Sequence, residues 1–221
     1  MSDTDKRQMP VWQESLLLVV TALVMAIIVK AFFVQAFYIP SESMEPGLLV
    51  NDKILVQKVS YWFGGPQRGD VVVFDDPGGW LDESSAVTAT NPVQKVLELV
   101  GLFPTGGHLI KRVIGVGGDH VVCCDKQGRL TINGTAIDEP YTLATPGATS
   151  EQKFDVKVPD GHIWVMGDNR GNSADSRVHL GDPGGGFVDV HQVVGKSWLR
   201  VWPLDRIGFA HDPDVFDNIE P

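Results

Sequence analysis

The sequence predicts a mainly β protein in which an N-terminal transmembrane helix precedes a β-rich domain with long loops and one inserted short helix. A long apolar run lies near the N-terminus, and short or alternating apolar runs fill the rest of the chain. The 24 glycines and 14 prolines supply many turns between those runs. With 221 residues, 43% of them hydrophobic, the chain is long enough to build one good core.

The apolar run predicts a membrane anchor over residues 15–37, behind a tail over residues 1–14. Residues 15–29 carry no charge, and the run resumes after Lys30, whose long side chain can reach the membrane interface from near one end. Trp12 and Tyr38 flank the run, where interfacial aromatic residues are common.

Two alternatives to an anchor stay open. The small residues around Val34-Gln35-Ala36 match a cleavage site for a secretory signal, although Phe32, Phe33 and Phe37 crowd it. A buried core helix is the other alternative. Few basic residues flank the run, so the charges alone do not set its orientation.

The remainder of the chain, residues 38–221, reads as the β-rich domain. Its candidate strands are residues 53–59, 70–74, 108–116, 119–124, 129–133, 162–167 and 193–202. Residues 76–107 interrupt this pattern and are interpreted as an insertion. Within it, residues 92–103 place apolar side chains on one helical face, which predicts a short amphipathic helix packed on the sheet.

Charge and cysteine content exclude several functions. The formal net charge is −10, and the residues after Tyr38 carry 15 Lys and Arg against 25 Asp and Glu. Such an acidic domain is a poor binder of nucleic acid. Cys123 and Cys124 are the only cysteines, and we interpret them as buried small side chains or a weak thiol pair, with a redox switch as the less favoured alternative.

The segment Ile39-Pro40-Ser41-Glu42-Ser43-Met44-Glu45-Pro46 places two hydroxyl groups between prolines where the chain leaves the apolar run. Proline restricts its own backbone and that of the residue before it, so these hydroxyls are held in place. No nucleophile elbow of the Gly-x-Ser-x-Gly type occurs in the chain. The six histidines are isolated, so a Ser-His-Asp triad has no positive support, and no metal-ligand spacing is present.

Lys111 is the best candidate for the base that would activate one of these serines. It lies in the middle of the strand predicted over residues 108–116 and shares a face with Leu109 and Val113. Apolar surroundings disfavour the charged ammonium and lower the pKa of a lysine. An exposed lysine on an edge strand remains the alternative that the pattern alone leaves open.

Four segments in the same order closely resemble bacterial type I signal peptidases, which are Ser/Lys proteases. The insertion also resembles that of members from high-GC Gram-positive bacteria. The matching segments are residues 39–46, Arg68-Gly69-Asp70-Val71-Val72-Val73-Phe74, Leu109-Ile110-Lys111-Arg112-Val113-Ile114-Gly115 with Gly118-Asp119, and Gly167-Asp168-Asn169-Arg170-Gly171-Asn172-Ser173-Ala174-Asp175-Ser176-Arg177.

The resemblance implies a role for each matching position. Ser43 matches the nucleophile and Lys111 the general base. Ser41 matches the hydroxyl that joins the Ser43 N–H in the oxyanion hole, and Ser173 matches the serine that hydrogen-bonds and aims the lysine. The scaffold around the lysine is matched by Asp168, Asp175 and Arg177, and the substrate groove by Phe37, Ile39, Pro40 and Ile110.

A type I signal peptidase removes signal peptides from secreted preproteins after small residues, without a metal or other cofactor. The resemblance therefore implies a catalytic domain outside the cytoplasmic membrane, a single membrane pass, and a location near the secretion translocon. Two alternatives are another kind of Ser/Lys protease and a catalytically inactive, membrane-tethered β-domain. Glu42, in place of the small residue more usual between the two serines, is the departure nearest to the reacting groups.

Overall fold

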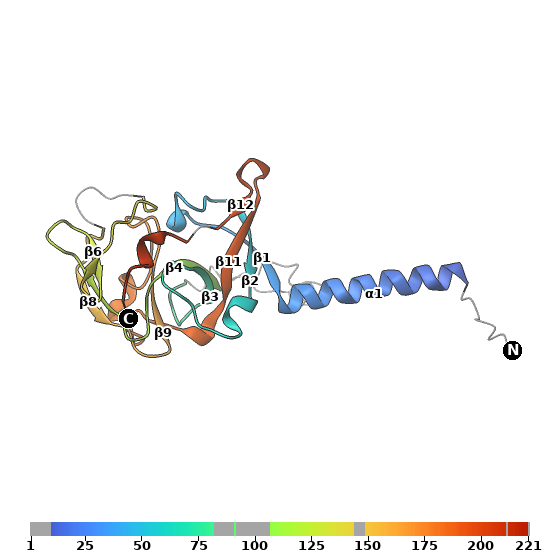
Figure 1. Cartoon of the computed structure of the whole chain (residues 1–221), viewed down its shortest axis with the longest axis horizontal. Helices are drawn as coiled ribbons and strands as arrows, with labels where there is room; N and C mark the ends of the chain where they lie inside the picture. Colours follow the sequence, from blue (N-terminus) through green and yellow to red (C-terminus); the bar gives the residue numbers. More distant parts are fainter. Residues whose placement is uncertain (1–9, 82–90, 92–106, 144–148, 211, 221) are drawn as a thin grey trace.

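The computed structural model describes residues 10–81, 91, 107–143, 149–210 and 212–220. The amphipathic helix predicted over residues 92–103 lies outside this described part. The described chain consists of one long helix and two antiparallel sheets (Figure 1).

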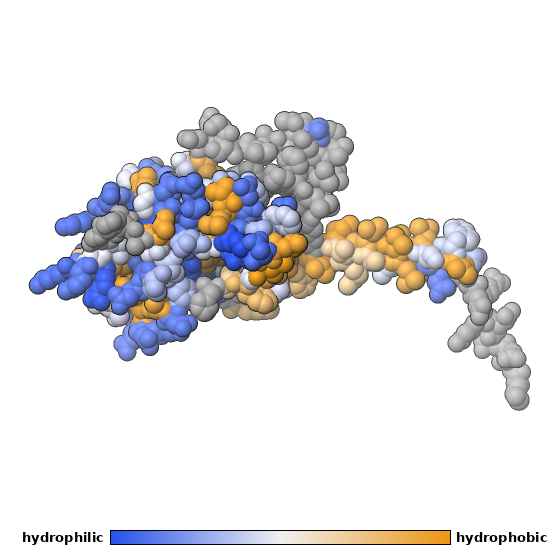
Figure 2. All heavy atoms as spheres, turned by 90° about the horizontal axis from the view of Figure 1, so that it is seen from above, coloured by the Kyte–Doolittle hydropathy of each residue, from blue (hydrophilic) through white to orange (hydrophobic). Residues whose placement is uncertain are grey.

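Helix α1 (Val11–Phe32) projects away from the sheets on one side of the molecule (Figure 1). Its apolar side chains surround the helix rather than forming one stripe, and they stay uncovered, as Figure 2 shows. Leu18 and Leu23, for example, are 66% and 58% exposed. Within the described residues, no helix has the length and apolarity that a membrane crossing requires.

The apolar run that we counted as one anchor divides into two elements. The helix ends at Phe32, and Val34–Tyr38 form strand β1, which pairs antiparallel with β2 (Lys53–Gln57) from Val34 opposite Gln57 to Tyr38 opposite Lys53. Valine, phenylalanine and tyrosine favour strands, and the hydrogen bonds to β2 decide the conformation of this stretch.

The larger sheet has eight strands in the order β1-β2-β11-β3-β4-β9-β10, with β12 paired to β11. Its remaining strands are β3 (Val71–Asp75), β4 (His108–Val116), β9 (His162–Met166), β10 (Val188–Asp189), β11 (Val193–Trp202) and β12 (Gly208–Phe209).

The smaller sheet lies at the end of the molecule opposite α1 (Figure 1) and has the order β7-β6-β5-β8. Its strands are β5 (His120–Cys123), β6 (Leu130–Ile132), β7 (Thr135–Ala136) and β8 (Phe154–Lys157). Short 3₁₀ helices connect the strands: η1 (Glu42–Met44), η2 (Val59–Tyr61), η4 (Val178–Gly181), η5 (Val190–Gln192), η6 (Leu204–Arg206) and η7 (Asp214–Phe216).

Strand β4 is a central strand that is buried on both faces. It pairs with β3 on one side and with β9 on the other, and every residue from Leu109 to Gly115 is buried. The alternative of an exposed edge strand for Lys111 is therefore wrong. All seven predicted strands are present, although β1, β7, β8, β10 and β12 were not predicted.

Cys123 and Cys124 are joined to each other by a disulfide bond at the end of β5. The two cysteines are therefore not a thiol pair in this structure, whereas the other interpretation, a buried small side chain, holds for Cys123. Cys123 also packs in the core beneath the smaller sheet, where its neighbours include Leu130 and Phe154.

Candidate active site

The structure brings together Ser43 and Lys111, which are 68 positions apart in the sequence. Ser43 lies in η1, directly after the segment that follows β1, and Lys111 lies in the middle of β4. Lys111 Nζ lies 2.8 Å from Ser43 Oγ and 3.0 Å from the Ile110 carbonyl oxygen. Both side chains are nearly inaccessible, with residue exposures of 6% for Ser43 and 4% for Lys111. A hydroxyl group and an amine therefore stand within proton-transfer distance in a dry environment.

Burial sets the protonation of Lys111. Loss of hydration lowers its pKa from 10.5 to about 8, although the Asp175 and Asp168 carboxylates act in the opposite direction, and the Arg177 guanidinium adds to the lowering. The carboxylates of Asp168 and Asp175 lie near the amine, but each is already paired with an arginine. They therefore do not neutralise the charge of a Lys111 ammonium. A lysine in this state carries an appreciable neutral fraction near neutral pH, as a general base requires.

Ser41 lies beside Ser43, and its part in an oxyanion hole stays a prediction. Its Oγ lies 3.2 Å from Ser43 Oγ, and it is the residue directly before η1. The Ser43 N–H belongs to the first turn of η1, where backbone N–H groups have no carbonyl partner within a helix. A hydroxyl and a backbone N–H next to the nucleophile are the kind of donors that stabilise an oxyanion.

Ser173 does not make the contact that was expected of it. Its Oγ is buried and has no hydrogen-bond partner among the described residues, so it does not aim Lys111 in this structure. It stands close to the Asp175 carboxylate instead. It also packs against Gly167, where an added Cβ would collide with Ser173 and with the Ser43 carbonyl oxygen.

The three scaffold residues, together with Arg112, form two buried ion pairs beside the lysine. Arg112 donates two hydrogen bonds to Asp168, at 2.8 and 2.7 Å, and Arg177 donates two to Asp175 at the same distances. Burial raises the pKa of Asp175, but the hydrogen bonds and charge of Arg177 and the Gly167 N–H outweigh it, so the pKa is lowered. These pairs keep charge beside Lys111 while fixing the segment that faces Ser43.

The four predicted groove residues lie near the serine but differ in access. Pro40 is exposed and Phe37 is half-buried, with its ring edge-on to His108 at 5.3 Å between centroids. Ile39 and Ile110 belong to one core cluster and are 1% and 8% exposed. Their assignment to the substrate groove stays a prediction.

Two asparagines and one further ion pair at the site were not singled out from the sequence. The Asn169 N–H donates to the Ser43 carbonyl at 3.0 Å, and its side chain donates to the Glu42 carbonyl at 3.2 Å. Asn172 donates to the Glu42 carboxylate at 2.9 Å. Arg170 binds Glu139 in a two-pronged, buried pair. Glu139 could not be found from the sequence because it stands in an unmatched region far from the motifs.

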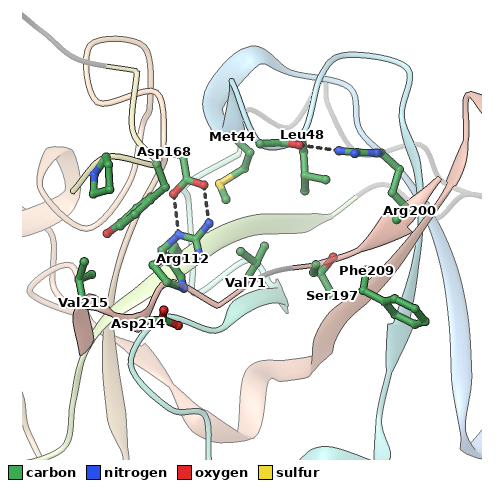
Figure 3. A pocket seen from close by; sticks show the side chains of 16 residues that line it. Met44, Leu48, Val71, Arg112, Asp168, Ser197, Arg200, Phe209, Asp214 and Val215 are labelled. Atoms are coloured by element: carbon green, nitrogen blue, oxygen red, sulfur yellow. Dashed lines mark hydrogen bonds and ion pairs between the residues drawn. The ribbon is translucent and has the colours of Figure 1, made fainter. Parts of the chain in front are cut away.

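A cavity of about 550 Å³ lies on the other side of the nucleophile segment. Met44 and Leu48 form one wall, and the Arg112–Asp168 pair forms another (Figure 3). Neither Ser43 nor Lys111 lines it, so it is separate from the reacting groups. On its rim, Arg200 donates to the Gly47 carbonyl at 2.7 Å and thereby holds the loop after Ser43.

In the part of the chain that the structure describes, no three His, Cys, Asp or Glu side chains are grouped to hold a metal ion.

Comparison with known proteins identifies the family of this chain. The family "Signal peptidase, peptidase S26" matches residues 12–202. A signal peptidase I from Mycobacterium tuberculosis is 41% identical, over 89% of this chain and 74% of its own, and a probable signal peptidase I from Mycobacterium leprae is 38% identical, over 92% and 80%. A crystal structure of a signal peptidase I from Enterococcus faecalis aligns with a TM-score of 0.37 and 26% identity, over 59% of this chain and 95% of that one. The chain therefore belongs to the signal peptidase family, peptidase S26, and is a peptidase.

Proposed function

We propose that this chain removes signal peptides from secreted preproteins, with Ser43 as the nucleophile and Lys111 as the general base. The observation that supports it most is the 2.8 Å contact between Ser43 Oγ and a buried lysine amine with a lowered pKa. Family membership supplies the substrate class. A lysine without a chemical role would keep its charged amine in water, where it is more stable. It would need neither the contact with Ser43 nor the burial that Lys111 shows.

The reaction follows from these groups. Neutral Lys111 Nζ accepts the proton of Ser43 Oγ while that oxygen attacks the carbonyl carbon of the scissile peptide bond. The Ser41 hydroxyl and the Ser43 N–H donate to the oxyanion that forms. The Lys111 ammonium then gives its proton to the departing amine, which leaves an acyl-enzyme on Ser43. Water, deprotonated by the same amine, hydrolyses the ester and restores Ser43.

Substrate would bind as an extended strand beside the segment that ends at Ser43. Strand β1 is the last strand of the larger sheet on its side, and among the described residues it pairs only with β2. A free edge accepts an added strand through backbone hydrogen bonds, and surface pockets then choose side chains. Phe37, Pro40 and the small exposed part of Ile110 would offer shallow apolar contacts, which favours small residues before the cut and excludes large ones.

The membrane location belongs to the same proposal. The helical part of the predicted anchor, residues 15–32, would cross the membrane once, residues 1–14 would lie in the cytoplasm, and the domain that begins with β1 would lie outside the membrane near the translocon. The uncharged sequence over 15–29 and the uncovered apolar surface of α1 support this. Such a helix delivers Ser43 close to the bilayer surface, where a signal peptide emerges.

Two alternatives are weaker. A self-cleaving Ser/Lys protease of the repressor type would need a DNA-binding domain, and a net charge of −10 disfavours binding to DNA. A catalytically inactive relative that only binds other proteins would not require a buried lysine amine 2.8 Å from a serine hydroxyl.

The test is incubation of the detergent-solubilised full chain with a preprotein, followed by N-terminal sequencing of the product. We expect one cut after a small residue at the end of the signal peptide. Ser43→Ala should abolish this cut, and Lys111→Arg should nearly abolish it, because guanidinium stays protonated and cannot act as a base. Wild-type turnover by the Ser43→Ala variant would overturn the assignment.

A further inference from the structure

Nearly every charge around the reacting groups is neutralised by a partner. Asp168 is paired with Arg112, Asp175 with Arg177, and Glu139 with Arg170. Lys111 is the fourth buried cation and has a lowered pKa. The site therefore presents little net charge from its interior.

Two carboxylates beside Ser43, Glu42 and Glu45, make no ion pair with any described residue. Of the two, Glu42 is the one that side-chain amides hold in place. It stands between Ser41 and Ser43 in the chain, and its side chain is exposed. Its carboxylate accepts a hydrogen bond from the Asn172 amide, and its carbonyl accepts one from the Asn169 amide. Both donors are neutral, and Glu42 makes no ion pair with any described residue. The two amides thus hold a full negative charge in place beside the nucleophile without cancelling it.

A substrate that lies along β1 must pass this charge. In the proposed binding mode the substrate strand runs parallel to β1, so that the residues before the scissile bond lie beside β1 and Pro40. The residues after the scissile bond then leave Ser43 across η1, the short helix that also carries Glu42. The side chains that meet Glu42 are therefore those at the start of the mature protein.

We propose that Glu42 is a specificity-determining residue, which favours a basic side chain and disfavours an acidic one among the first residues after the cleavage point. This inference rests on the proposed function. A lysine or arginine there would pair with the carboxylate, whereas an aspartate or glutamate would be repelled by it. An exposed pair of charges changes binding only modestly, so the Lys-to-Glu preference should be about three- to tenfold. Salt should weaken it, because both charges face water.

The experiment uses peptides with alanine before the cleavage point and Lys, Gln or Glu at each of the first three positions after it. The solubilised full chain is assayed for kcat/KM with each peptide, at about 0.05 M and about 0.5 M salt. The measured quantity is the ratio of the Lys peptide to the Glu peptide within each variant, so that differences in overall activity cancel. The variants are Glu42→Gln and Glu42→Lys.

Two matched controls remove one carboxylate each. Glu45→Gln changes the charge of the same loop, and Glu151→Gln changes the charge at an exposed residue of the 149–210 stretch. We expect the wild-type ratio to exceed about three at one position or more, to approach one in Glu42→Gln, and to fall below one in Glu42→Lys. Both controls should keep the wild-type ratio at low salt.

Several outcomes would overturn the inference. These are a wild-type ratio of one at all three positions, an unchanged ratio in Glu42→Gln, or an equal loss in Glu45→Gln, which would assign the effect to the loop as a whole. Equal cleavage of all peptides contradicts only the role of Glu42. Failure of the wild type to cleave any peptide contradicts the proposed function and the inference together.

Discussion

At the scale of single residues, the central feature is Lys111, whose charged form is destabilised by burial. The Lys111 amine loses its hydration in the core, and in exchange it donates two hydrogen bonds, to Ser43 Oγ and to the Ile110 carbonyl oxygen. Asp175 and Asp168 are near, but their arginine partners limit what they offer the ammonium. The lowered pKa is the measure of what the folded state loses by burying this group.

This cost predicts that Lys111→Met makes the protein more stable near neutral pH. The folded pKa of about 8 lies below the ordinary 10.5, so the unfolded chain holds the proton more tightly and wild-type stability rises as pH increases between these values. Below about pH 8 the wild type carries the full penalty. The variant should gain about 1–3 kcal/mol near pH 7, and the gain should vanish above about pH 10. Thermal unfolding at both pH values measures it, and a variant that is less stable at both would contradict the account.

At the scale of elements, the site depends on two segments that face each other, η1 with Ser43 and the stretch after β9 with Gly167. Gly167 has no Cβ, and this allows the Ser43 carbonyl oxygen and the Ser173 side chain to approach its Cα closely. The Gly167 N–H in turn binds Asp175 at 2.9 Å, which ties this stretch to the scaffold of the lysine. Packing that is this close transmits small displacements directly to the nucleophile.

Gly167→Ala should therefore lower both activity and stability. The new methyl group would push on the Ser43 backbone and on Ser173, and overpacking of this kind costs about 1–3 kcal/mol. Displacement of Ser43 from Lys111 should reduce kcat by about 10²-fold, because catalysis is sensitive to misplacement on the scale of 1 Å. Gly64→Ala is the control, since nothing lies within 4 Å of an added Cβ there. Equal kcat for the two variants and the wild type would show that the contact is unimportant.

The elements also show what the sequence could and could not predict. Alternation and buried runs identified β4 and β11 with their observed ends. Strand β1 was hidden because its apolar residues continue the pattern of the helix before it, and only pairing with β2 separates the two. The pattern around Lys111 could not distinguish an edge strand from a central one, because this depends on which strands lie beside it.

The same limit applies to the site. The reacting pair Ser43 and Lys111 could be predicted from motifs, and their contact confirms that they meet. The expected hydrogen bond from Ser173 is absent here, although its motif is present. Glu139 gave no signal at all, because its role arises only from the fold that places it on Arg170. A motif therefore names residues more reliably than it names their hydrogen bonds.

At the scale of the whole molecule, one helix and a β-rich body with an acidic surface are joined directly at β1. Figure 2 shows the division between the apolar helix and the polar body. We predict that residues after Tyr38 are outside the cytoplasmic membrane. Protease added to intact spheroplasts should degrade them, whereas a cytoplasmic protein of the same cells should survive as the control. Protection of this domain, or a mature N-terminus at Phe37, would contradict the proposed topology.

The pH dependence of kcat/KM on a peptide with alanine before the cleavage point tests the Ser43–Lys111 pair most directly. This parameter reports the ionisation of the free enzyme, and only neutral Lys111 can accept the serine proton. Activity should fall as pH decreases, with half of the plateau value near the Lys111 pKa of about 8. An acid limb near 10, as for a solvated lysine, or near 6.5, as for an ordinary histidine, would mean that Lys111 is not the base.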